Sequence, residues 1–318
     1  MFAIQAITEQ GFAKWILQDT SNGTSAEVIP ACGAMLHAFT VDNRGHRVNV
    51  IDGYADADDF AQNVTSKGFK SSKLSPFACR LKHGQYHFGE QDYTVHKFYL
   101  GPHALHGLLY DAVYEVVDSQ ADEEAATLTL LHTYRGADSG YPFAYDCKVT
   151  YRLAVNNRLT LTTVILNESG GLIPIQDGWH PYFGFGGSIN DLQLEFQSKE
   201  KVVFDNDLLP TGQLERYETF GSLTVLGDTP FDDCFTLNFA ECQPLCVLRD
   251  ATQKMQLEIY PDRSYPYLQI YTPPHRQSIA IENLSAAPDA FNNGMGLRVL
   301  AAGESASFIT AYQISILA

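Results

Sequence analysis

Two side chains of this sequence, His180 and Glu282, have surroundings that are compatible with proton transfer. His180 lies in the segment 177–187, where aromatic residues flank it and a glycine-rich stretch follows. Glu282 interrupts the mostly apolar segment 278–284, and a glutamate is rarely buried unless it is paired or functional. Carboxyl and imidazole groups titrate close enough to neutral pH to act as a general base and a general acid.

Each candidate residue also has a purely structural interpretation. A histidine among aromatic rings can be a packed core residue, and a glutamate on a strand can face the solvent. Arg80 follows the mostly apolar segment 75–79, and it can pair with an acid or present its fork of donors to a polyol. Asp232 and Asp233 are adjacent, so in a strand they point to opposite faces and at most one of them faces a given pocket.

The histidine spacings raise the question of a metal site. The pairs His83/His87 and His103/His106 have spacings that suit metal ligands on a helix. We expect strands and loops in both places, and residues four apart along a strand are ~13 Å apart. We therefore expect no metal. The glycine-rich phosphate-binding motifs and the Gly-x-Ser-x-Gly elbow are also missing, so we expect no cofactor and a reaction performed by side chains on a small molecule.

The elements that position these residues are predicted to be short strands. Helical signals are limited to 54–60 and to one turn within 286–291. No linker, repeat or shift in composition divides the chain, so we expect a single all-β domain over residues 1–318, with large antiparallel sheets packed face to face. The clearest alternation of apolar and polar residues falls at 128–130, 147–153, 159–162, 192–196, 255–259 and 267–271, the last before Pro273-Pro274.

Composition excludes several classes of protein. The chain has 21 Lys and Arg against 37 Asp and Glu, a formal net charge of −16, which argues against binding to nucleic acid. No apolar run approaches the ~18–20 residues that span a bilayer, so we expect no membrane partner. The six cysteines are scattered, and no basic, apolar leader opens the sequence. These features predict a cytoplasmic protein with reduced thiols.

Several motifs, taken together, resemble those of the aldose 1-epimerase (galactose mutarotase) family. They occur in one order and span roughly residues 25 to 315, and each would be a weak signal by itself. The motifs are Phe77-Ala78-Cys79-Arg80-Leu81 with Gly84 and Gly89, Leu105-His106-Gly107, His180-Pro181-Tyr182-Phe183, Phe231-Asp232-Asp233-Cys234-Phe235, Ile281-Glu282 with Pro288-Asp289-Ala290-Phe291-Asn292, and the stretch Leu300 to Glu304.

The resemblance implies a galactose mutarotase-like β-supersandwich that interconverts the α and β anomers of a free sugar. It implies that Glu282 is the base that takes the anomeric hydroxyl proton and that His180 is the acid that protonates the ring oxygen. Arg80, His106 and Asp232 are implied to hold the sugar hydroxyls. This agrees with the chemistry of the residues, because opening a hemiacetal needs one proton taken and one given, with no redox change.

Departures from the family pattern leave the substrate open. Cys79, Leu108, Asp233 and Asn283 stand where the family often has Asn, Gly, His and Pro. None of these changes removes a proton-transfer residue, but they reshape the pocket wall, so the resemblance does not fix galactose or glucose as the preferred sugar. Two alternatives remain at this point: a hexose 6-phosphate epimerase, and a sugar-binding protein without catalysis. The sequence is compatible with a monomer or a homodimer.

Overall fold

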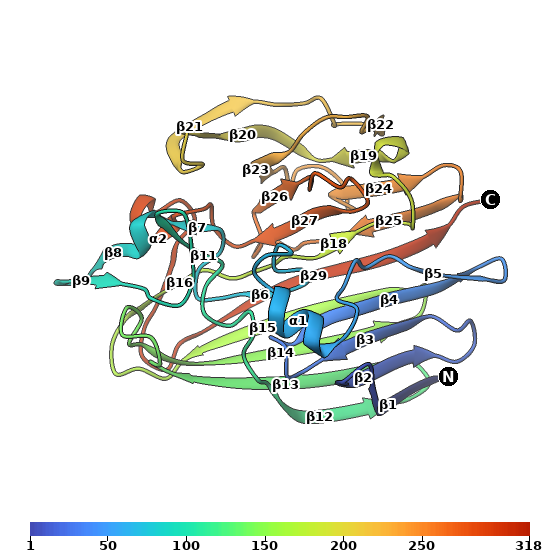
Figure 1. The fold of residues 1–318 in the computed structure, drawn as a ribbon, viewed down its shortest axis with the longest axis horizontal. Coiled ribbons are helices and arrows are strands. Elements are labelled where there is room, and N and C mark those ends of the chain that lie inside the picture. The colour runs from blue at the N-terminus through green and yellow to red at the C-terminus, as the bar shows by residue number, and fades with distance from the viewer.

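The computed structural model describes all 318 residues, and its largest element is a nine-stranded antiparallel sheet. The long strands of this sheet cross the whole molecule (Figure 1). In spatial order the sheet contains β12 (Glu115–Ala121), β13 (Ala125–Arg135), β14 (Ala144–Ala154), β15 (Arg158–Asn167), β29 (Ser305–Ile316), β25 (Met255–Ile259), β24 (Cys246–Asp250), β19 (Gln193–Phe196) and β22 (Thr224–Val225).

Two further sheets pack against this large sheet. The five-stranded sheet contains β1 (Phe2–Glu9), β2 (Phe12–Asp19), β3 (Ser25–Ile29), β4 (Met35–Asn43) and β5 (His46–Asn49). The eight-stranded sheet contains β21 (Pro210–Arg216), β20 (Ser198–Phe204), β23 (Asp232–Leu237), β26 (Tyr267–Tyr271), β27 (Ile279–Leu284), β17 (Gly178–Trp179) and β6 (Lys73–Leu74), with β18 (Tyr182–Phe183) paired to β27.

Side-chain contacts join the nine-stranded sheet to the five-stranded and eight-stranded sheets. The Tyr151 hydroxyl on β14 donates a hydrogen bond of 2.8 Å to the Ala34 carbonyl before β4. On the other side, Phe183 of β18 packs edge-on against Tyr312 of β29, with ring centroids 5.2 Å apart. A bridge between Ile51 and Phe183 connects the five-stranded and eight-stranded sheets. The nine-stranded sheet therefore faces a second layer made of the other two, which is the face-to-face β architecture that the sequence predicted.

Alternating side chains explain why these segments form strands. In β15 every second residue is buried, with Leu159, Leu161 and Ile165 on the inner face and less buried residues such as Thr160 and Thr162 between them. Burial of one face of each strand against the facing layer supplies the hydrophobic stabilisation that holds the sheets together. The predicted strands at 255–259 and 267–271 coincide with β25 and β26.

Short elements outside the three large sheets complete the fold. Both helices are too short and too polar to span a bilayer. The predicted helix at 54–60 begins later, because the Asp56 side chain accepts a hydrogen bond from the Asp59 amide and caps the helix at that point. The short elements are α1 (Ala57–Asn63), α2 (Ala290–Asn293), the sheet of β10 (Tyr99–Leu100), β11 (His103–Leu105) and β7 (Arg80–Leu81), and the pairs β8 (Gln85–Phe88) with β9 (Gln91–Thr94) and β16 (Ile173–Ile175) with β28 (Arg298–Leu300).

The chain next to the site does not continue as a strand beyond Leu81. A strand continuing through Lys82 would place this lysine on the same face as Arg80. Instead β7 ends at Leu81, and residues 82–84 form a single 3₁₀ turn in which His83 has a φ of 54°. The turn takes Lys82 and His83 to a different surface depression. Neither side chain lines the cavity that contains Arg80.

Candidate active site

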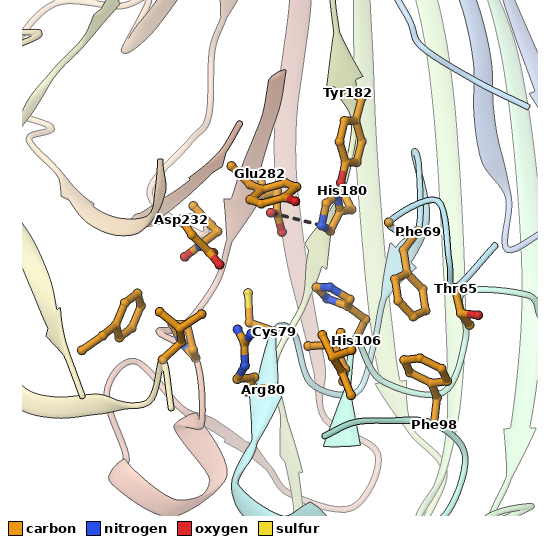
Figure 2. A pocket seen from close by; sticks show the side chains of 18 residues that line it. Thr65, Phe69, Cys79, Arg80, Phe98, His106, His180, Tyr182, Asp232 and Glu282 are labelled. Carbon is orange, nitrogen blue, oxygen red and sulfur yellow. Dashed lines mark hydrogen bonds and ion pairs between the residues drawn. The ribbon is translucent and has the colours of Figure 1, made fainter. Parts of the chain in front are cut away.

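A cavity of about 270 Å³ opens on the eight-stranded sheet. Figure 2 shows its lining from close by. Strands β23, β26 and β27, the β17–β18 segment and the loops around β7, β10 and β11 all contribute to it. The lining residues are Thr65, Gly68, Phe69, Cys79, Arg80, Phe98, Leu100, Leu105, His106, His180, Tyr182, Phe204, Leu208, Asp232, Gln269, Tyr271, Glu282 and Pro288.

Strand register brings the polar residues of the cavity together. Gln269 on β26 lies directly opposite Glu282 on β27, and on its other side it faces Cys234 of β23. Asp232 is two residues before Cys234 and therefore points to the same face. The Gln269 side-chain amide donates a hydrogen bond of 3.0 Å to Asp232 Oδ1. Three adjacent strands thus present a carboxylate, an amide and a second carboxylate to one cavity.

His180 and Glu282 form the centre of the site. His180 Nε2 lies 3.3 Å from Glu282 Oε1, and both side chains are buried (Figure 2). His180 is placed by backbone pairing, since its amide donates to the Ser72 carbonyl and its own carbonyl accepts from the Ser71 amide. An imidazole and a carboxyl group at this distance can exchange a proton with each other or with one ligand held against both.

The imidazole ring is oriented mainly by other rings. It stacks on Tyr182 with an interplanar angle of 16° and a centroid distance of 5.1 Å. His106 meets it edge-on at 4.8 Å, and Phe69 in turn meets His106 edge-on at 4.8 Å. Such offset-stacked and edge-to-face contacts are the favoured arrangements of aromatic rings. They hold the Nε2 atom of His180 toward Glu282.

Burial moves the acidities of the two central groups in opposite directions. Burial lowers the pKa of His180 to about 4. Burial, with a smaller contribution from the Asp232 charge, raises the pKa of Glu282 well above its usual range. Both shifts follow from the cost of placing a charge in a dry environment. A protonated Glu282 beside a neutral His180 is therefore the favoured state of the free site.

Arg80 brings a positive charge into the cavity. It is the only lysine or arginine among the lining residues, and Figure 2 draws no hydrogen bond or ion pair from its guanidinium group. Burial raises the pKa of Asp232, and the charge of Arg80 opposes that shift. The guanidinium group thus has donors that face the cavity, and it is close enough to Asp232 to be felt by that carboxyl group.

The loops behind Arg80 and His106 contain strained backbone. Cys79 and His106 have φ values of 54° and 61°, and the His106 amide donates a hydrogen bond of 3.0 Å to the Cys79 carbonyl. A left-handed conformation costs a non-glycine residue about 1–3 kcal/mol and is concentrated at functional sites. Gly107 follows with a φ of +74°, and a Cβ atom there would lie 2.4 Å from the Ser75 carbonyl oxygen, so only glycine fits behind His106.

Several buried polar atoms of the cavity residues have no hydrogen-bond partner. Oε2 of Glu282, Oε1 of Gln269, and Nδ1 of both His106 and His180 have no hydrogen-bond partner within the protein. Buried polar groups are nearly always paired in folded proteins. Four of them around one cavity are therefore available for hydrogen bonds to a ligand.

The structure brings together all five residues singled out in the sequence. Glu282, His180, Arg80, His106 and Asp232 all line the cavity. The prediction that the adjacent aspartates diverge is confirmed, because Asp233 Oδ1 lies instead 3.2 Å from Lys201 Nζ.

Several cavity residues were missed. Gln269 could have been recognised as a polar residue among the large side chains of 267–271, but Phe69, Phe98, Phe204 and Leu208 come from loops and strand ends without a pattern.

The histidine pairs that suggested metal ligands are separated in the structure. His87 Nδ1 lies 2.8 Å from Asp92 in the exposed β8–β9 hairpin. The His83 ring lies against the His103 ring, with centroids 5.2 Å apart, whereas His106 belongs to the cavity. No group of three His, Cys, Asp or Glu side chains is arranged to hold a metal ion.

Comparison with known proteins defines first the fold and then the family. The fold matches a galactose mutarotase-like protein from Clostridium acetobutylicum with a TM-score of 0.87 and 18% identity over 99% of each chain. Among curated relatives, a maltose epimerase of Levilactobacillus brevis is 25% identical, covering 82% of this chain and 80% of the relative. An aldose 1-epimerase of Streptococcus thermophilus is 24% identical, covering 96% of this chain and 95% of the relative.

The family model described as aldose 1-epimerase matches residues 15–313, which is nearly the whole chain. The protein therefore belongs to the aldose 1-epimerase family and is an isomerase that acts on carbohydrates.

Proposed function

We propose that this protein interconverts the α and β anomers of a free hexose, galactose or glucose, with Glu282 and His180 as its proton-transfer pair. The observation that carries the proposal is the 3.3 Å approach of His180 Nε2 to Glu282 Oε1 at the buried end of a polar cavity. The reaction requires no group besides an acid and a base, placed within hydrogen-bond reach of the two oxygens on the anomeric carbon.

The proposed steps balance without any external reactant. Glu282 takes the proton of the anomeric hydroxyl, the C1–O1 bond becomes a carbonyl, and the bond from C1 to the ring oxygen breaks. His180 gives its proton to that ring oxygen. The open chain then rotates about C1–C2, and the same two transfers in reverse close the ring on the other face of the carbonyl.

Binding of the sugar prepares the pair for this chemistry. In the free site burial places the shared proton on Glu282, because the pKa of that carboxyl group is raised and the pKa of His180 is lowered. A sugar hydroxyl that donates to Glu282 stabilises the carboxylate, and a ring oxygen that accepts from His180 stabilises the imidazolium. The proton then crosses to His180, and the base and acid of the proposed mechanism are formed.

The remaining polar groups are proposed to hold the other hydroxyls. Arg80 has free donors for hydroxyl oxygens, while Asp232 and Gln269 supply acceptors. His106 presents Nδ1, which has no partner within the protein. Because burial lowers the pKa of His106, its imidazole is neutral and can both donate and accept a hydrogen bond.

A hexose 6-phosphate is a weaker candidate. Arg80 is the only cationic lysine or arginine of the cavity, and two carboxyl groups share that cavity. The 3₁₀ turn takes Lys82 away from it, and the chain has a net charge of −16. A dianionic substrate would therefore meet little positive charge.

We also propose that the enzyme is cytoplasmic. Its six cysteines are all unpaired, which fits a reducing compartment.

Polarimetry of freshly dissolved α-D-galactose and α-D-glucose tests the proposal. Catalytic amounts of protein at low buffer concentration should accelerate the optical change of at least one of the two sugars. The double variant Glu282→Gln/His180→Ala is the control for contaminating activity. Acceleration of hexose 6-phosphates alone would favour the phosphate alternative, and sugar binding without any acceleration would favour a non-catalytic binding protein.

A further inference from the structure

Arg80, the cation of the cavity, has a side chain that the protein does not tether. Figure 2 draws no hydrogen bond or ion pair from its guanidinium group, and the residue is only half-buried. A long charged side chain loses much conformational freedom when it is held in one place. The direction of this side chain therefore depends on the backbone of β7, from which it extends. A residue that fixes this backbone also places the donors of Arg80.

Strand β7 lies at the edge of its small sheet. It pairs with β11 along one side only, with Arg80 opposite Leu105 and Leu81 opposite Ala104. In a strand, the carbonyl of one residue and the amide two positions later point to the same edge. The Arg80 carbonyl and the Lys82 amide therefore both point to the edge that β11 leaves open.

Asp289 closes this open edge with two hydrogen bonds. Its backbone amide donates to the Arg80 carbonyl at 2.9 Å, and its Oδ1 accepts from the Lys82 amide, also at 2.9 Å. The carboxyl group thus takes the place that the carbonyl of a neighbouring strand has in an antiparallel ladder. A residue 207 positions after Lys82 in the sequence holds the backbone on both sides of Leu81.

Asp289 has an unusual conformation for the residue that precedes a helix. An aspartate at this position ordinarily caps the helix with its side chain. Asp289 has a φ of 58° and a ψ of 27°, and its side chain makes no capping bond to α2. It is 7% exposed, and its carboxyl group is directed to β7 instead. A left-handed conformation persists only where the surrounding structure enforces it, and such residues cluster at functional sites.

The neighbours of Asp289 in the sequence link it to the cavity wall. Asn292 Nδ2 donates to Asp289 Oδ1 at 2.7 Å and to the Gln85 carbonyl at 2.9 Å, so it holds the carboxyl group against the segment that follows β7. Pro288 lines the same cavity as Arg80, whereas Asp289 does not. Asp289 therefore supports the wall of the cavity without facing a ligand.

We infer that Asp289 is a positioning residue, which fixes the backbone of β7 so that Arg80 is directed into the cavity before a sugar binds. This inference deepens the proposed function and rests on it. A preformed donor group favours binding, because less conformational freedom is lost when the ligand arrives. Loss of Asp289 should therefore weaken sugar binding. The chemical step should change little, since His180 and Glu282 are held by other backbone pairings.

The test measures anomerisation of the hexose that wild-type protein accelerates most. Asp289→Ala removes the acceptor of the Lys82 amide and should raise KM about fivefold, with kcat changed less than about twofold. Asp289→Asn keeps an oxygen acceptor and tolerates a positive φ, so its KM should stay within about twofold of wild type. In the Arg80→Ala background, Asp289→Ala should raise KM no further, because the group that it positions is absent.

Two more variants complete the experiment. Asp138→Ala is the matched control, because Asp138 Oδ2 accepts from the His96 amide at 2.8 Å and does not line the cavity. This variant loses a bond of the same kind elsewhere and should keep the wild-type KM. Asn292→Ala replaces Asp289→Ala if the latter does not fold, since Asn292 is exposed. It should raise KM about twofold, and only while Arg80 is present.

The possible outcomes separate this inference from the proposed function. An unchanged KM in Asp289→Ala, a loss confined to kcat, or equal effects of Asp289→Ala with and without Arg80 would overturn the positioning role alone. Where Asp289→Ala does not fold, an unchanged KM in Asn292→Ala would do the same. If wild-type protein accelerates neither galactose nor glucose, the proposed function fails and the positioning role with it.

Discussion

At the scale of single residues, the site depends on two buried groups whose charges are costly. Glu282 and His180 are both almost inaccessible to water. Burial therefore raises the pKa of Glu282 and lowers the pKa of His180, which favours the neutral form of each group. The same burial that makes Glu282 a strong base destabilises its carboxylate. Such residues lower the stability of the folded protein, and the same unfavourable environment makes them reactive.

The pH dependence of the free enzyme follows from the proton count of the pair. Catalysis needs one proton shared by Glu282 and His180. At low pH His180 gains a second proton, and its pKa of about 4 places the acidic limb of kcat/KM near that pH. At high pH the pair loses its proton as Glu282 ionises, above the normal glutamate range. We expect a bell-shaped profile, and an acidic limb near the usual histidine pKa of ~6.5 would contradict this picture.

Substitution of Glu282 by glutamine should separate activity from stability. Glu282→Gln removes the base and should lower kcat at least ~10²-fold. The folded protein raises the pKa of Glu282, so this group opposes folding once the pH exceeds the unfolded value of ~4.3. The variant should therefore melt at a higher temperature than wild type at pH 7, and the difference should shrink toward pH 4. Equal melting temperatures at pH 7 would argue against a buried, destabilising carboxyl group.

Arg80→Ala should act mainly on binding. The guanidinium group has no ion pair drawn to it in the cavity, so its removal costs few contacts within the protein. We expect KM to rise about tenfold or more, as for the loss of one hydrogen bond to a charged group, with a smaller change in kcat. Arg80→Lys keeps the charge but not the planar fork. A loss confined to kcat in Arg80→Ala would place this residue in the chemical step instead.

At the scale of elements, a buried ion pair ties together the strands that lead into the site. Lys73 Nζ lies 2.5 Å from Asp177 Oδ2, and both side chains are fully buried. Lys73 also donates to the Gly178 carbonyl and lies over the Trp179 ring at 4.5 Å. Tyr265 donates a hydrogen bond of 2.6 Å to Asp177 Oδ1. The network joins β6 to the start of β17. Its acidic member, Asp177, is three residues before His180 in the sequence.

Breaking this ion pair should cost much more than breaking a surface pair. Lys73→Met leaves Asp177 uncompensated in the interior and should lower the free energy of unfolding by about 3–5 kcal/mol. Lys67→Met is the control, because its pair with Asp59 is partly exposed and should contribute about 0–1 kcal/mol. Urea unfolding measures both. In the double variant Lys73→Met/Asp177→Asn the loss should be smaller than the sum of the single losses, and simple additivity would contradict a coupled pair.

At the scale of the whole molecule, one core connects the three large sheets. A continuous cluster of 62 buried apolar residues runs from Phe2 to Ile314 and includes Val28 on β3, Leu128 on β13 and Ile281 on β27. No sheet buries its inner face without a neighbour. We therefore propose that residues 1–318 form a single cooperative unit, in spite of a length at which many chains divide into two domains.

The two tryptophans allow this unit to be tested. Trp15 lies on β2 in the five-stranded sheet and Trp179 on β17 beside the site. Fluorescence of Trp15→Phe reports on the surroundings of Trp179, and fluorescence of Trp179→Phe reports on those of Trp15. Within each variant, the fluorescence midpoint in urea should coincide with the midpoint of the far-UV circular dichroism signal. Earlier unfolding at Trp15 than in the bulk signal would show that the five-stranded sheet is a separate unit.

The sequence by itself determined the strands and the residues of the polar end of the cavity. Alternation with a period of two is a local property, so β25 and β26 could be placed from their own residues. The five predicted site residues belong to ordered motifs, and all five line the cavity. The turn that withdraws Lys82 escaped notice because a left-handed conformation at His83 leaves no mark in the apolar pattern.

Only the tertiary structure decided what these residues can do together. Gln269 meets Glu282, and Asp232 faces the same cavity, because of the register of three strands, which depends on how whole sheets pack. The acidity of Glu282 and His180 depends on burial by many distant residues, and the cavity draws Phe98, Leu100, Phe204 and Leu208 from separate strand ends and loops. Distances, burial and shape arise from contacts between segments far apart in the chain, so no local pattern contains them.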